Sequence, residues 1–258
     1  MCYDISFTVN VKQLSDYFPD LIFDDQIKID FDKAVHILGH AYGLHPILFK
    51  NREDKLLHCK LMEWGCIPFY VKDLKAFSKQ RASMLNAKSE RILTDTKSYW
   101  NKIREKRCLI PVTGFYEHRE VKGITKKVVY LVGLKNQATF FLPGLYSVAE
   151  VADENGEVQK IWSYTIITRA ANAVMRQIHN GGDNPNRMPL MLPFEMAKKW
   201  VLDELTPGEY QAILDYEIPS EELEYKTVYT IRSSKPRPDN KAKDEFYDWG
   251  DKVPEIII

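Results

Sequence analysis

Residues 107–118 read RCLIPVTGFYEH, and the pattern of this stretch decides the fold class. Two runs, 108–111 and 114–119, lie on either side of a Val-Thr pair. Short runs rich in β-branched and aromatic residues, bounded by proline or glycine, are typical of β-strands. Two later runs, at 128–134 and 139–146, have the same character. We therefore predict that this part of the chain forms consecutive antiparallel strands.

Further strands and helices are predicted on both sides of this stretch. Strands are expected at 5–9, 57–64 and 162–167, and the sequence DENG at 153–156 predicts a hairpin turn. Helices are expected at 97–107, at 169–178 with Thr168 as N-cap, at 193–205 and at 207–214. Many short strands with a few helices predict an α+β fold, with a curled antiparallel β-sheet or barrel core and flanking helices.

Composition places the chain among globular proteins. Hydrophobic residues make up 45% of its 258 residues, which is enough for a sizeable core. Lys plus Arg equals Asp plus Glu, 36 each, so any nucleic-acid-binding surface has to be a local basic patch. No window is apolar enough to span a membrane, and the start MCYDISFTVNVKQ does not have the pattern of a secretory signal. We expect a cytoplasmic protein with one domain over 1–232 and a polar, surface-hugging or mobile tail over 233–258.

Four cysteines are present, and three of them have an ordinary context. Cys59, Cys66 and Cys108 lie in apolar or alternating stretches, where buried thiols are expected. The spacing of the four includes no CxxC pair and no metal-binding pattern, so we expect free thiols in a reducing compartment. Cys2 differs because it directly follows Met1.

Cys2 gains an unusual chemistry if Met1 is removed. Its α-amine and its thiol then form a 1,2-aminothiol, in which the amine condenses with an aldehyde and the thiol closes onto the imine carbon. The product is a durable five-membered thiazolidine. Both groups have pKa values of about 8 to 8.5 in solution, so modest local changes make either one nucleophilic. Because cysteine also occurs at position 2 by chance, this feature needs support from the rest of the chain.

That support comes from the order of five stretches. They are Met1-Cys2, WGCIP (64–68), NAKSE (86–90), RCLIPVTGFYEH (107–118) and ITRAANAVMRQIHNGGDNPNRMPLML (167–192). In this order they resemble the SRAP family, the SOS response-associated peptidase-like proteins that shield abasic sites in single-stranded DNA. The resemblance covers residues 2 to 230. It implies self-removal of Met1, covalent trapping of the abasic-site aldehyde by Cys2, and no cofactor; abasic single-stranded DNA is the implied partner of a monomer.

The resemblance also implies roles for three polar side chains. Glu117 matches the catalytic glutamate, and a buried carboxyl there can shuttle the proton when the carbinolamine loses water. His179 matches the family histidine, which can protonate the sugar ring oxygen or the leaving group. Asn86 can hold the Cys2 amine or a sugar hydroxyl, or stabilise an oxyanion while Met1 is cleaved. The structural alternatives are a solvent-facing or salt-bridged glutamate, a histidine at a helix C-terminus and a turn asparagine.

The DNA contacts are where this chain departs from the family pattern. Tyr3-Asp4 replaces an early Gly-Arg, and an aspartate there would repel a phosphate while Tyr3 can stack on a base. Residues 180–186 form an insertion before Arg187. Phosphate partners and stacking aromatics are therefore expected among the residues that match the family positions or lie near them: Lys72, Lys88, Arg91 and Arg187 for phosphates, Phe69 and Tyr70 for stacking.

Two other functions share the same residues. An N-terminal-nucleophile cysteine peptidase or amidohydrolase would use Cys2, Asn86 and His179 and would turn over added peptides. A non-covalent module for single-stranded nucleic acid would bind without any need for Cys2. Aldehyde trapping, peptide turnover and plain binding are thus the three activities to separate.

Overall fold

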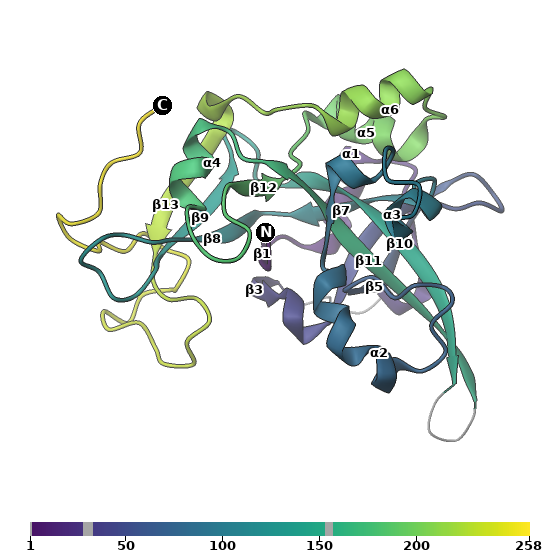
Figure 1. The fold of residues 1–258 in the computed structure, drawn as a ribbon, viewed down its shortest axis with the longest axis horizontal. Helices are drawn as coiled ribbons and strands as arrows, with labels where there is room; N and C mark the ends of the chain where they lie inside the picture. The colour runs from purple at the N-terminus through teal and green to yellow at the C-terminus, as the bar shows by residue number, and fades with distance from the viewer. Residues whose placement is uncertain (1, 28–32, 153–156) are drawn as a thin grey trace.

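Five strands close into a barrel at the centre of the computed structural model (Figure 1), which describes residues 2–27, 33–152 and 157–258. The barrel strands are β4 (Leu44–Lys50), β5 (Leu57–Trp64), β7 (Arg107–Val112), β10 (Phe140–Ala152) and β11 (Val158–Ala170). Neighbours along the order β5-β4-β7-β10-β11 pair antiparallel. A parallel pairing of β11 with β5, at Ser163 with Glu63 and Tyr164 with Trp64, closes the ring. The predicted α+β class with a curled, largely antiparallel barrel is confirmed.

A second, antiparallel sheet lies beside the barrel. Its strand order is β13 (Leu223–Val228), β9 (Val128–Leu134), β8 (Gly114–Arg119), β1 (Asp4–Phe7) and β3 (Ala34–Leu38). The chain passes from the barrel to this sheet at Thr113, between β7 and β8. Gly114 follows; a Cβ there would lie 2.6 Å from Leu131 Cδ1 and 3.2 Å from Val132 O, so a larger residue would require these neighbours to shift.

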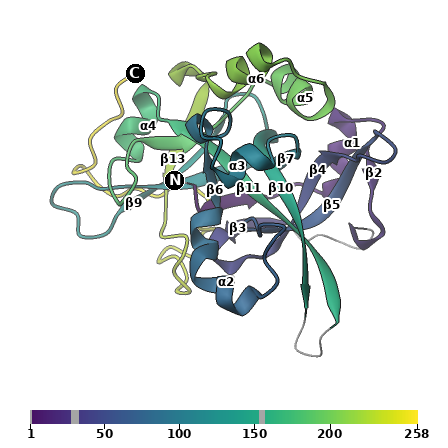
Figure 2. The same cartoon turned by 45° about the vertical axis from the view of Figure 1, so that its right-hand side comes forward.

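Short strands and helices complete the fold. The strands are β2 (Ile22–Phe23), β6 (Asn86–Lys88) and β12 (Arg187–Pro189), and the 3-10 turns span 11–13, 25–27, 39–41, 82–84, 89–91 and 220–222. The helices are α1 (Leu14–Tyr17), α2 (Leu74–Arg81), α3 (Tyr99–Lys102), α4 (Ala173–Ile178), α5 (Phe194–Leu202) and α6 (Pro207–Leu214). In Figure 2, α5 and α6 cover one end of the molecule, while α4 lies near the N-terminal end of the chain. Among the described residues, none of these helices has the length and apolar character to cross a membrane.

Several predicted elements have the expected bounds. β5, β8, β9 and α6 begin and end where their patterns do, and Thr206 caps α6 through Glu209 N. β10 and β11 are longer than predicted because they form one long hairpin, with Ala152 opposite Val158. The predicted DENG turn at 153–156 lies outside the described residues.

The prediction for 169–178 was wrong at its start. β11 continues to Ala170, because Thr168, Arg169 and Ala170 pair with β12. The helix therefore begins only at Ala173, and Asn172 rather than Thr168 is its N-cap, accepting from Met175 N. Tertiary strand pairing overrides the local helical pattern here. The helices predicted at 97–107 and 193–205 are likewise shorter, as α3 and α5.

Residues 233–258 pack on the second sheet. Arg237 is buried and donates to the carbonyls of Ala242, Glu245 and Phe246, which fixes a loop. Tyr247 N then donates to Thr227 O in β13 at 2.9 Å. In the structure this segment therefore lies against β13.

Replacing Asn172, the N-cap of α4, tests how much this residue stabilises the start of the helix. Asn172 is buried, and its Nδ2 also donates to Ile218 O at 3.0 Å. Asn172→Ala removes the cap and leaves a buried carbonyl unpaired, so we expect a loss of about 2–3 kcal/mol in unfolding free energy. The control is Asp73→Ala, which removes only the exposed cap of α2 and should cost about 1 kcal/mol. Equal losses in chemical denaturation would contradict this account.

Candidate functional site

Cys2 is fully buried just before β1, within the main apolar cluster. Its thiol lies 3.8 Å from Asp4 O as a weak donor. Burial raises the pKa of this thiol well above its usual value, and the charges of Glu117 and Asp4 raise it further. The group is therefore a neutral thiol in this state, not a thiolate. The other three cysteines are also buried free thiols, as predicted.

Asn86 lies on β6 and pairs with Ile166 of β11, so the strand pairing fixes its position. Its Nδ2 donates to the backbone carbonyl of Cys2 at 2.9 Å. Its Oδ1 is buried and accepts no hydrogen bond from the described residues. The Asn86 amide therefore fixes the backbone of Cys2, and its Oδ1 remains able to accept a hydrogen bond.

Glu117, on β8, is only 3% exposed. Because burial penalises the charged form, the pKa of this carboxyl is raised to about 8. Its Oε1 has no hydrogen-bond partner among the described residues. The alternative of a solvent-facing glutamate is excluded by this burial, and the side chain is mostly protonated at neutral pH.

His179 follows the last turn of α4 and faces Glu117. Its Nε2 lies 3.8 Å from Glu117 Oε2, and its Nδ1 lies 2.8 Å from Arg187 O. The same Nδ1 also lies 3.2 Å from Arg187 N, which can only donate to it. Because a carbonyl oxygen only accepts, the shorter of the two contacts favours the tautomer with the proton on Nδ1. Burial lowers the pKa of His179 to about 4, so the imidazole is neutral near pH 7. In this adjacent pair, the pKa of Glu117 is therefore raised and the pKa of His179 is lowered.

A pocket of about 280 Å³ opens beside this pair. It is lined by Tyr3, Asp4, Glu117, His118, Lys127, His179, Gly181, Gly182, Asp183, Asn184 and Arg232. The insertion 180–186 therefore supplies one wall of the pocket. Asn180 ties this loop to Glu120 through two hydrogen bonds of 2.8 and 2.9 Å, and Asn186 N donates to His179 O at 2.8 Å. The loop returns to Arg187 without displacing His179.

Asp4 does not face the pocket as a bare negative charge. Arg232 contacts both of its carboxylate oxygens, at 2.8 and 2.5 Å, and His36 Nε2 lies 2.7 Å from Oδ1. Burial by itself would raise the pKa of Asp4, but the hydrogen bonds from His36 and Arg232 lower it. Arg232 therefore places a guanidinium beside Asp4, where the sequence alone predicted repulsion of a phosphate. Sequence analysis missed it because 228 residues separate the pair.

The aromatic candidates gather at one exposed position. Phe69 and Tyr70 are 46% and 58% exposed, with ring centroids 5.6 Å apart. Each also lies 5.8 Å from the ring of Tyr99, whose hydroxyl accepts from Phe69 N. Tyr99 was not predicted, since its place in a helical pattern gave no sign of this contact. The Tyr3 ring instead lies tilted at 49° to the ring of His40, with the centroids 4.8 Å apart, and Tyr3 lines the pocket.

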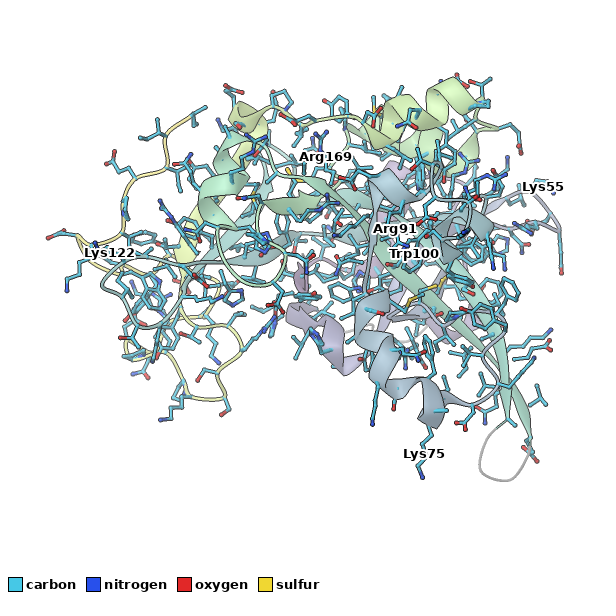
Figure 3. The ribbon with its side chains drawn as sticks, in the orientation of Figure 1. Lys55, Lys75, Arg91, Trp100, Lys122 and Arg169 are labelled. Carbon is cyan, nitrogen blue, oxygen red and sulfur yellow. The ribbon has the colours of Figure 1, made fainter. Side chains whose placement is uncertain are left out.

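The basic candidates divide into bound and available side chains. Arg187 forms two contacts of 2.5 and 3.0 Å with Glu90 and donates to Thr168 O, so its guanidinium holds strands together. Arg91 makes a surface pair with Asp95, a contact that is readily exchanged. Lys72 Nζ donates to Glu150 O at 3.3 Å, and Lys88 lies half-buried on β6. In Figure 3, Lys55, Lys75 and Lys122 extend outward at separate edges of the molecule.

Among the described residues, no three histidine, cysteine, aspartate or glutamate side chains are placed to hold a metal ion.

Comparison with known proteins identifies a family. Residues 1–232 match the family model described as SOS response associated peptidase (SRAP). The abasic site processing protein YoaM of Bacillus subtilis is 30% identical over 222 residues, covering 84% of this chain and 89% of its own. YoqW of the same organism, which carries the same description, is 30% identical over 67% of this chain and 70% of its own.

Solved structures share the fold at lower sequence identity. A protein from Bacteroides thetaiotaomicron superimposes with a TM-score of 0.74 at 23% identity, covering 95% of this chain and 97% of that one. A protein from Bordetella bronchiseptica gives 0.68 at 18% identity, covering 89% and 100%. The barrel with its second sheet is therefore an established architecture.

The titration of Glu117 should be visible in stability. Its pKa is 4.5 ordinarily and about 8 here, so between these values the folded state binds more protons and stability falls as pH rises. Glu117→Gln removes this titration. Its stability relative to the parent should rise by about 2 kcal/mol between pH 6 and pH 8, or roughly 5 °C in Tm. Thermal unfolding at both pH values measures this, and Glu120→Gln, at an exposed position, is the control that should show no such trend.

The Asp4–Arg232 pair makes a separate prediction. Arg232→Ala leaves the buried carboxylate with His36 alone, so we expect a loss of about 2 kcal/mol at pH 7, less than for a fully buried pair because the Arg232 side chain is 44% exposed. The double variant Asp4→Asn/Arg232→Gln should recover most of this loss. Urea unfolding of both variants tests the account, and a double variant less stable than Arg232→Ala would refute it.

Proposed function

Because the chain belongs to the SOS response associated peptidase (SRAP) family, we propose that it processes abasic sites by binding single-stranded DNA and trapping the lesion covalently through Cys2. The observation that carries the proposal is the Glu117 carboxyl, buried with a pKa of about 8 beside His179 in a pocket that Tyr3, the residue after Cys2, also lines. Removal of Met1, by the protein's own activity, frees the Cys2 amine. An acid that stays protonated at neutral pH is the group that aldehyde condensation requires.

The abasic sugar has to open before it can react. Ring opening of the hemiacetal needs a base at the anomeric hydroxyl and an acid at the ring oxygen. Neutral His179, with its pKa of about 4, fits the base, and protonated Glu117 fits the acid. This assignment differs from the expectation that His179 donates the proton, because its lowered pKa leaves little imidazolium near pH 7.

Condensation then proceeds in two steps. The proton that His179 took in ring opening first passes to the Glu117 carboxylate. The Cys2 amine then adds to the aldehyde carbon to give a carbinolamine, whose hydroxyl leaves as water with a proton from Glu117 and leaves an iminium ion. The thiol adds to the resulting imine carbon, and the thiol proton returns to the Glu117 carboxylate as the ring closes. The balance is one aldehyde plus one aminothiol giving one thiazolidine and one water. The thiol enters last, which accords with the raised pKa of the Cys2 thiol.

DNA binding is assigned to the exposed aromatic position and to nearby cations. Phe69 and Tyr70, supported by Tyr99, offer ring faces on which bases of any sequence can stack. Lys88, Arg91 and Lys72 are the phosphate partners we propose, since the Arg187 guanidinium is engaged by Glu90 and Thr168. A lesion without a base suits this mode of recognition, because stacking and phosphate contacts need no base edge.

Mass spectrometry of the intact protein with an oligonucleotide carrying one abasic site tests the proposal. We expect loss of Met1 and then a stable mass increase equal to the oligonucleotide minus one water. Cys2→Ala should form no adduct, yet bind an undamaged oligonucleotide within about twofold of the parent, since binding rests on phosphate and stacking contacts away from the thiol.

The matched control substrate carries a tetrahydrofuran in place of the abasic sugar, which has no aldehyde and should give no adduct. Full crosslinking by Cys2→Ala would refute the role of Cys2. Turnover of added peptides without any adduct would establish the peptidase in its place. Binding that is unaffected by capping the aldehyde, again without an adduct, would establish a plain binding module.

A further inference from the structure

The last residues of the chain bridge two elements of the site. They lie beyond the family-matched residues 1–232, and Trp249 Nε1 anchors them to Val228 O in β13 at 3.0 Å. Further on, Pro254 O accepts from Arg119 Nη1 at 2.6 Å. Arg119 is buried on β8, and the same Nη1 lies 3.1 Å from the Tyr130 hydroxyl. The segment is thus fixed to β8 by a buried guanidinium.

Its next contact is with α4. Gln177 Nε2 donates to Ile257 O at 2.7 Å, and Ile257 N donates back to Gln177 Oε1 at 3.0 Å. Between the two attachments, Ile256 packs against the main apolar cluster, which includes Val174 and Ile178 of α4. Residues 254–257 therefore join β8 to α4 through polar contacts at both ends and apolar packing between them.

These two attachment points lie next to the reactive pair. Arg119 is two residues after Glu117 on the same strand, so both side chains lie on the same face of β8. Gln177 is two residues before His179, in the last turn of α4. We propose that residues 254–257 form a positioning strap, which holds β8 and α4 together and so sets the separation of Glu117 and His179. The predicted effect of the strap on the rate of adduct formation rests on the proposed function, whereas its predicted effect on the separation of Glu117 and His179 does not.

The physical need for such a strap follows from the length of α4. A helix of six residues is not stable by itself, so its position comes from its contacts with the rest of the chain. A small shift of α4 would lengthen the 3.8 Å contact and admit water to Glu117. Misplacement of a catalytic group by about 1 Å can cost up to a hundredfold in rate. The strap restrains this motion from outside the pocket, without touching the substrate.

The variants to compare are a deletion of residues 254–258 and the point change Gln177→Ala. The matched control is Gln211→Ala on α6, where Gln211 Nε2 donates only to Asp215 of its own helix end at 2.9 Å. If the deletion lowers stability too far, Gln177→Ala still tests the proposal. The charged and titratable groups that share the pocket with Glu117 are unchanged in all three variants: Tyr3, Asp4, His118, Lys127, His179, Asp183 and Arg232.

The first readout is the rate of adduct formation as a function of pH. With the strap released, we expect the rate to fall about tenfold and its alkaline limb to move to lower pH, because water reaches Glu117. Affinity for an undamaged oligonucleotide should not change. A segment that serves stability alone would lower Tm and leave the pH profile in place at temperatures well below unfolding.

The second readout needs no activity. Titration of the Glu117 side-chain carboxyl by carbon-13 NMR should give a lower midpoint in the deletion and in Gln177→Ala than in the parent and in Gln211→Ala. If the intact protein forms no adduct, the proposed function fails while this titration still decides the strap. Unchanged midpoints in both variants would overturn the strap, whatever the adduct rate.

Discussion

Pairing along β11 holds the candidate site together, because strands on both of its sides carry groups that reach Cys2 or His179. β6 pairs with it at Ile166 and so presents Asn86 to the carbonyl of Cys2. β12 pairs with it at Ala170 and so brings the Arg187 carbonyl to Nδ1 of His179. The parallel contact with β5 closes the barrel beneath them. A change in the register of β11 would displace all of these groups at once.

The chemistry of the site depends on burial rather than on a strong charge. Glu117 and His179 lie in one low-dielectric place, which favours the neutral form of each and therefore shifts their pKa values in opposite directions. Such a pair provides an acid and a base at the same pH. The cost is that the fold carries a carboxyl which resists ionisation, so stability and reactivity oppose each other at Glu117.

Segments that extend or depart from the family pattern shape the surroundings of the pair. The insertion 180–186 forms one wall of the pocket, and Asp4 with Arg232 forms another, so the unusual Tyr3-Asp4 sequence is compensated by a residue near the end of the matched region. Arg187, which the sequence predicted as a phosphate partner, holds Glu90 instead of presenting a free guanidinium. A match of residue type therefore did not establish a DNA contact in this case.

The sequence by itself determined the bounds of β5, β8 and β9, the α+β class with a curled antiparallel core, and the candidate site residues. Alternation and turn residues are local properties, so β5, β8 and β9 could be read directly. The motifs picked out Cys2, Asn86, Glu117 and His179, and the structure joins Asn86 to Cys2 and places His179 beside Glu117. Only the tertiary structure decided the start of α4, the pairing of Arg232 with Asp4, the contact of Tyr99 with Phe69 and the shifted pKa values. Each of these depends on which distant residues are buried together, and burial is a property of the packed chain that no local pattern contains.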